Sequence, residues 1–240
     1  MDTDKKDKGG IMAKQKRVTR KQLLKEPDEF ITTTGRIIRW ARQYTRQVAY
    51  IAGACLLLLV VIAGYQYFSN RAENKAFLLL DQAVGKYEDQ KAGMDALVAY
   101  ENSREDFEYI IKKYDHTKGG KLATVVFAGM SCDAGEAEKA IQLYEAALDS
   151  FKGDTTYQNI LWSGLGYAYE KKKDVRMAVS FFEKIAGGDD PVAKDVALFN
   201  MGRLYHELGD TVRSRQAYER LVAEHMDSMY YQLAVEKLAG

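Results

Sequence analysis

The longest apolar stretch of the chain runs from Gln47 to Asn70, where 24 consecutive positions carry no charged residue. Its centre reads IAGACLLLLVVIAGY. At about 1.5 Å per residue, a helix of this length is roughly 36 Å long and crosses a hydrocarbon core of about 30 Å. A buried core helix is the alternative, but soluble folds seldom contain uncharged runs this long. The pattern predicts a transmembrane helix over residues 47–70.

Beyond this segment, a pattern of small, aromatic and aliphatic positions recurs four times. A small residue is followed four positions later by an aromatic ring, and three positions after that by an apolar residue, with 37, 38 and 36 residues between copies. The copies are Ser103/Phe107/Ile110, Ala140/Tyr144/Ala147, Ala178/Phe182/Ile185 and Ser214/Tyr218/Leu221. These spacings place all three residues on one helix face, so the pattern predicts a helical repeat.

The helix expected before each copy has a pattern of its own. Apolar, glycine and tyrosine positions at i, i+3, i+4 and i+7 occur in Trp162/Leu165/Gly166/Tyr169 and again in Leu198/Met201/Gly202/Tyr205, with a weaker form in Thr124/Phe127/Ala128/Ser131. Glycine inside a helix costs about 1 kcal/mol relative to alanine. We therefore expect Gly166 and Gly202 to mark close contacts with a neighbouring helix.

These two patterns together resemble the tetratricopeptide repeat, which has Trp, Leu, Gly and Tyr on its first helix and Ala, Phe and Ala on its second. The resemblance implies an all-α fold, in which a single transmembrane helix is followed by an α-solenoid of about four helix pairs. The first helix of the earliest pair is expected between Lys75 and Tyr87, with an insertion near Gly93. A capping helix is expected from Ser228 to Leu238.

The distribution of charge indicates the orientation of the chain in a membrane. Residues 1–46 carry 13 Lys and Arg against 6 Asp and Glu, and the remainder carries 22 against 28, within a net charge of +1. Positive charge before a span favours the cytoplasmic side. We therefore expect a single-pass protein of the inner membrane, with a cytoplasmic N-terminus and an exported, periplasmic repeat domain over residues 71–240.

The N-terminal head divides into two expected parts. Residues 1–25 are expected to be a basic, largely disordered cytoplasmic segment whose charge suits anionic lipid better than nucleic acid. Residues 26–46 are expected to form an amphipathic juxtamembrane helix at the membrane interface. The interface residues expected on it are Arg36, Arg39, Trp40, Arg42 and Arg46.

An enzymatic role is not expected. The three histidines are far apart, and we find no metal-ligand spacing, phosphate-binding loop or nucleophile motif. Gly119 and Gly120 are expected to end a loop. Cys132 has no intrachain partner once Cys55 is placed in the span, so it is expected to be a buried free thiol. We expect no cofactor, metal, small-molecule substrate or nucleic acid.

Protein binding is therefore the expected activity, on the concave face that the first helices of such repeats form. The residues expected there are Val125, Ser163, Tyr167, Glu170, Phe199, Arg203 and His206. Their mixture of aromatic, apolar and charged groups suits an unfolded or exported polypeptide. The alternative, equally open, is that Tyr167 and Phe199 simply pack the superhelix.

The order of basic head, single span and exported repeats is similar to that of the YfgM family of inner-membrane proteins. The run LeuLeuLysGluProAspGluPhe, residues 23–30, is also similar to such proteins. The resemblance implies an accessory subunit of the Sec translocon that acts beside periplasmic chaperones such as PpiD. A structural adaptor in a cell-envelope or division assembly, without client binding, is the alternative.

Overall fold

The computed structural model describes residues 29–239, and all regular structure in that range is α-helical. The expected all-α fold is confirmed. The helices are α2 (Glu29–Gln43), α3 (Thr45–Lys91), α4 (Ala96–Lys113), α5 (Lys118–Asp133), α6 (Ala137–Ser150), α7 (Thr155–Lys171), α8 (Val175–Ala186), α9 (Pro191–Glu207), α10 (Thr211–Glu224) and α11 (Tyr231–Ala239). The expected disordered segment 1–25 lies outside the described residues.

The chain comprises two compact units that divide between residues 64 and 65. In the first unit, α2 ends at Gln43 and α3 begins at Thr45, whose hydroxyl donates to the carbonyl of Arg42 at 2.8 Å. Of the helices in residues 29–239, α3 is the one long and apolar enough to cross a membrane, and none of its apolar window is buried by protein. That exposure is unlike a core helix and is consistent with a single membrane span.

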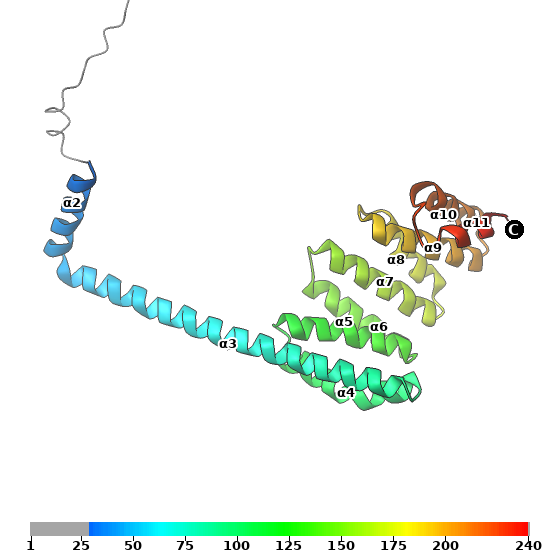
Figure 1. The fold of residues 1–240 in the computed structure, drawn as a ribbon, viewed down its shortest axis with the longest axis horizontal. Helices are drawn as coiled ribbons and strands as arrows, with labels where there is room; N and C mark the ends of the chain where they lie inside the picture. The colour runs from blue at the N-terminus through cyan, green and yellow to red at the C-terminus, as the bar shows by residue number, and fades with distance from the viewer. Residues whose placement is uncertain (1–28, 240) are drawn as a thin grey trace, which may run out of the picture. The chain divides into compact units, whose positions relative to one another are not determined.

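Helix α3 continues without a break to Lys91 (Figure 1). The boundary expected between residues 70 and 71 therefore lies inside one helix. Ala76, Leu80, Ala83 and Tyr87 on its C-terminal part are buried in the core of the second unit. This part of α3 serves as the first helix of the first repeat pair.

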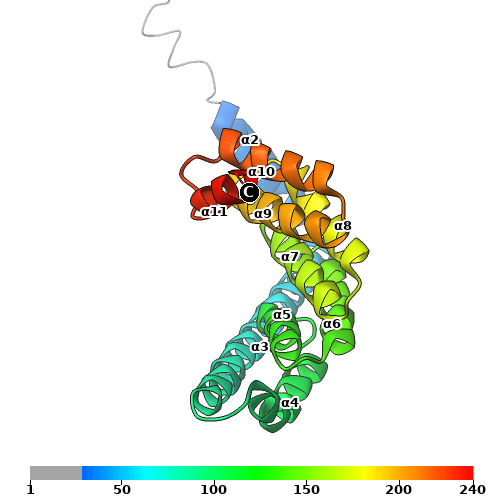
Figure 2. The same ribbon diagram turned by 90° about the vertical axis from the view of Figure 1, so that its right-hand side faces the viewer.

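The second unit is a stack of helix pairs: α5/α6, α7/α8 and α9/α10 pack directly, α3 and α4 are paired through a shared buried core, and α11 follows α10. We call α3, α5, α7 and α9 the first helices and the other member of each pair the second helix. Figure 2 shows α5, α7 and α9 along one side of the stack and α6 and α8 along the other. The stack bends toward the first helices, whose exposed side we call the inner face.

The turns within successive pairs share one backbone feature. Gly135, Lys173 and Gly209 follow α5, α7 and α9, and each has a positive φ, at 87°, 69° and 76°. Glycine adopts this left-handed conformation without the steric cost that a side chain imposes. Two of the next helices, α8 and α10, begin at capping aspartates: Asp174 accepts from the backbone nitrogen of Met177 at 3.1 Å, and Asp210 accepts from that of Arg213 at 3.0 Å.

The recurring small and aromatic positions form the core, as the sequence predicts. The small residues Ser103, Ala140, Ala178 and Ser214 are buried, and so are the four aromatic rings that follow them. The ring of Phe107 stacks on Phe127 with centroids 5.3 Å apart. Each second helix thus places its ring between the helices that it contacts.

The expected close contacts at two glycines are also present. A Cβ atom on Gly166 would lie 2.6 Å from the ring of Phe182, and one on Gly202 would lie 2.5 Å from the ring of Tyr218. Both rings belong to the second helix of the same pair. The missing side chain is what lets the ring lie against the first helix.

The junction between α3 and α5 depends on a carboxylate and two further glycines. Glu73 accepts from the backbone nitrogens of Lys118 and Gly119, both at 3.0 Å, and so caps α5 from another helix. The expectation that Gly119 and Gly120 end a loop is wrong, because both lie in the first turn of α5. A Cβ on Gly119 would lie 2.8 Å from the Cβ of Ala76, so close packing explains this glycine.

Candidate protein-interaction surface

The seven residues expected on the concave face all lie on first helices. Val125 belongs to α5, Ser163, Tyr167 and Glu170 to α7, and Phe199, Arg203 and His206 to α9. Helices α5 and α7 are in direct contact, and side chains join α7 to α9. Most of the predicted positions therefore lie along the inner face, beginning at Val125 on α5.

A charged pair joins α7 to α9 across this face. The guanidinium of Arg203 donates to both carboxylate oxygens of Glu170, at 2.5 and 2.8 Å, and to the side-chain oxygen of Asn200 at 2.8 Å. These bonds to Glu170 raise the pKa of Arg203 above its usual value. A bidentate pair of this kind fixes both side chains. The ion pair between Glu170 and Arg203 therefore joins two neighbouring repeats, so these side chains already have a structural role.

The two predicted aromatic residues differ in their surroundings. Tyr167 is 39% exposed, its hydroxyl accepts from Nδ2 of Asn200 at 3.1 Å, and its ring meets Phe182 edge to face. Phe199 is half-buried, because the ring of Tyr230 stacks on it with centroids 4.6 Å apart. Tyr167 therefore presents a rigid aromatic surface to solvent, whereas Phe199 largely packs the C-terminal end of the solenoid.

The remaining predicted residues, Val125, Ser163 and His206, differ in burial and in location. Val125 is half-buried and packs against the core shared by α5 and α7, and Ser163 is half-buried on α7. His206 is exposed and lines a hollow beside Val212 on α10 and Leu238 on α11. The structure places His206 with the C-terminal cap and not with Tyr167.

Sequence reasoning missed an apolar hollow between the N-terminal halves of α7 and α9. It has a volume of about 280 Å³. Its lining consists of Thr156, Asn159, Ile160, Ser163, Ile185, Asp190, Val192, Ala193, Val196 and Ala197. Ile160 lies one turn before Ser163 on the same helix face, so extending the predicted inner face by one turn would have found it.

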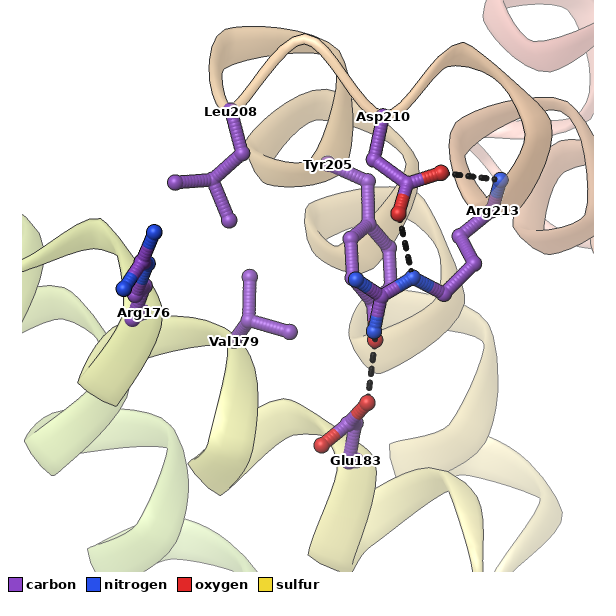
Figure 3. A pocket seen from close by; sticks show the side chains of 7 residues that line it. All are labelled: Arg176, Val179, Glu183, Tyr205, Leu208, Asp210 and Arg213. Carbon is purple, nitrogen blue, oxygen red and sulfur yellow. Dashed lines mark hydrogen bonds and ion pairs between the residues drawn. The ribbon is translucent and has the colours of Figure 1, made fainter.

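A second hollow, of about 360 Å³, lies between α8, α9 and α10 and is drawn in Figure 3. Tyr205 donates to Glu183 there, and burial together with this bond raises the pKa of Tyr205 to about 12. Arg213 donates to Asp210 at 2.5 Å and lies 4.4 Å from the centre of the Tyr205 ring. These groups bind one another, so the network stabilises the α9/α10 pair.

The side chains that could hold a metal ion or act as a nucleophile are few in the described part of the repeat domain. Among residues 29–239 there is no group of His, Cys, Asp and Glu side chains that could hold a metal ion. Cys132 is a buried free thiol, as expected, and its burial raises its pKa. A thiol that resists ionisation is a poor nucleophile.

The residues expected at the membrane interface are exposed in the first unit. Arg36, Arg39, Trp40 and Arg42 lie on α2, and Arg46 lies in the first turn of α3. The ring of Trp40 lies 5.8 Å from that of Tyr44. Basic and aromatic side chains of this kind are typical of a membrane interface, and their role there remains a prediction.

The fold and its inner face define a helical-repeat protein of the interaction type. A family model described as a tetratricopeptide repeat-like domain matches residues 39–239, and the chain therefore belongs to that family. A comparison with curated proteins finds no match to the chain. Repeat domains of this family are protein-interaction modules and are typically not catalytic.

Proposed function

We propose that this protein is a membrane-anchored scaffold, an accessory subunit of the Sec translocon that binds exported polypeptides or periplasmic chaperones such as PpiD. The observation that carries the proposal is that the span and the first repeat helix are one helix, α3. A partner on the inner face is thereby tied to the membrane. The similarity to the YfgM family supports the translocon as the site of action. A structural adaptor without client binding is the second candidate.

The orientation of the span is the first requirement of this proposal. Four arginines precede the apolar segment, at positions 36, 39, 42 and 46, so the N-terminus should stay in the cytoplasm and residues after Arg71 should be periplasmic. Protease added to spheroplasts should leave only a fragment containing the head and the span. Protection of the whole repeat domain would contradict both the periplasmic location and the translocon proposal.

Client binding is tested by site-specific photo-crosslinking in cells. A photoreactive residue replaces Tyr167 on the inner face or, as a matched control, Met177 on α8; the two native side chains are 39% and 38% exposed. We expect crosslinks to exported polypeptides or a periplasmic chaperone from position 167 and few from position 177, because exposed aromatic positions tend to anchor partners.

The same experiment separates the two candidate functions. Crosslinks to secretory polypeptides that disappear when protein synthesis is blocked would support the client-binding scaffold. Equal products from both positions would contradict an inner-face site. Crosslinks confined to stable membrane or envelope proteins would favour the structural adaptor.

A further inference from the structure

The apolar hollow between α7 and α9 contains one polar group whose bonding is incomplete. Asn159 is only 6% exposed and lies on its wall. Its Nδ2 donates to Oδ2 of Asp190 at 3.3 Å, which orients the amide. Its Oδ1 has no hydrogen-bond partner within the described part of the chain. That oxygen has almost no accessible surface, so Asn159 forms a buried polar part of the wall and does not itself contact a ligand.

The walls of the hollow suit an aliphatic side chain. Ile160 and Val192 are 49% and 77% exposed although they border a cavity, and Ile185 and Val196 extend the apolar lining. A volume of about 280 Å³ is below the usual range of roughly 300 to 1,000 Å³ for small-molecule sites. One side chain of an extended peptide fits this space better than a metabolite does.

The charge beside the hollow is negative. Asp190 lines it, Asp189 precedes Asp190, and Asp195 lies on α9 between lining residues 193 and 196. In the described residues no ion pair engages these three carboxylates. Of the nearby cations, Lys184 lies over the ring of Phe181, and Lys194 forms no ion pair with these carboxylates in the described part of the chain.

We propose that this hollow binds an aliphatic side chain of an extended polypeptide in which the adjacent residue is Lys or Arg. The aliphatic group fills the space beside Ile160 and Val196, and the cation lies by the aspartates. This inference rests on the proposed function, because it names the kind of segment that the inner face selects. Charge complementarity of this kind gives specificity more than affinity.

The test uses the full-length protein in mild detergent and fluorescent glycine- and serine-rich decapeptides. One peptide contains a Leu-Lys pair, and the others contain Ala-Lys, Leu-Gln or Leu-Glu. We expect the Leu-Lys peptide to bind about tenfold or more tightly than the Ala-Lys peptide, because burial of the leucine is lost. Replacing Lys by Gln should weaken binding about two- to fivefold, and replacing it by Glu should weaken it further.

Variants assign these effects to the hollow. Ile160→Ser should weaken the Leu-Lys peptide, and Val212→Ser, an exposed position on α10, is the matched control. The double variant Asp189→Asn with Asp195→Asn, which keeps Asp190, should reduce the preference for Lys over Gln but keep the preference for Leu over Ala. Asp149→Asn with Asp227→Asn removes the same charge from exposed positions elsewhere and should change neither preference.

The possible failures are distinguishable. If position 167 crosslinks exported polypeptides in cells but the peptides bind without regard to Leu or Lys, the scaffold function stands and this inference is wrong. Equal weakening by Ile160→Ser and Val212→Ser would also overturn it. If no peptide binds and no client is crosslinked, both proposals fail.

Discussion

Gly120→Ala is expected to lower the free energy of unfolding of the repeat domain by about 3 kcal/mol or more. A Cβ atom at this position would lie 1.9 Å from the carbonyl oxygen of Tyr114 and 2.5 Å from its carbon. That oxygen already accepts from the backbone nitrogen and the hydroxyl of Thr117, at 2.9 and 2.7 Å. The backbone cannot move aside without breaking these bonds. Denaturant unfolding of the full-length protein in mild detergent, followed by circular dichroism, measures the loss.

The matched control is Gly85→Ala, in the part of α3 that lies in the second unit. Gly85 is also helical, but it is exposed and nothing lies within 4 Å of a Cβ added there. Alanine should stabilise this helix by up to about 1 kcal/mol, because glycine is the poorer helix former. If the two variants unfold alike, the contact between Gly120 and the α4–α5 connection does not exist in solution.

Gly166 and Gly120 illustrate how much of the fold the sequence could predict. The repeat pattern was visible because each copy places its small, aromatic and apolar residues within seven positions of one helix, and Gly166 belongs to that local pattern. Gly120 does not. Glycine is required at position 120 because the backbone between α4 and α5 passes too close to leave room for a Cβ atom. From the sequence alone, two adjacent glycines resemble a loop.

The same limit applies to the end of the predicted span. The reappearance of charge at Arg71 predicts a boundary there, but charge alone does not end a helix, and no proline lies between residues 65 and 91. Helix α3 therefore continues to Lys91. Glu73 caps α5 by accepting from Lys118 and Gly119, which lie 45 and 46 positions further along the chain. Local periodicity in the sequence could not reveal such a distant contact.

The candidate surface was predictable in outline only. Assigning Tyr167 and Glu170 to the inner face required just the helical phase and the order of first and second helices. Their bonds to Asn200 and Arg203 depend on how far one repeat rotates against the next, which the sequence does not state. The cover that Tyr230 provides for Phe199 comes from the terminal segment, where the repeat pattern ends.

Gly166→Ala is expected to destabilise the domain by roughly 1 to 3 kcal/mol, because the added methyl overlaps a ring in the core. The Cβ would lie 2.6 and 2.7 Å from two ring atoms of Phe182, whose side chain is fully buried and has no room to withdraw. The ring's part in this loss is measured with Phe182→Leu, which removes the overlapping atoms but leaves a cavity and so also destabilises the domain.

The double variant Gly166→Ala with Phe182→Leu should unfold less easily than the two separate losses predict. The methyl and the shortened side chain would share the space that the ring occupied, so we expect a favourable coupling of about 1 kcal/mol or more. Gly85→Ala combined with Phe182→Leu is the control, and its effects should add, because nothing lies near Gly85. Additive losses in both pairs would mean that Gly166 and Phe182 do not touch, and the register of the repeats inferred from them would be wrong.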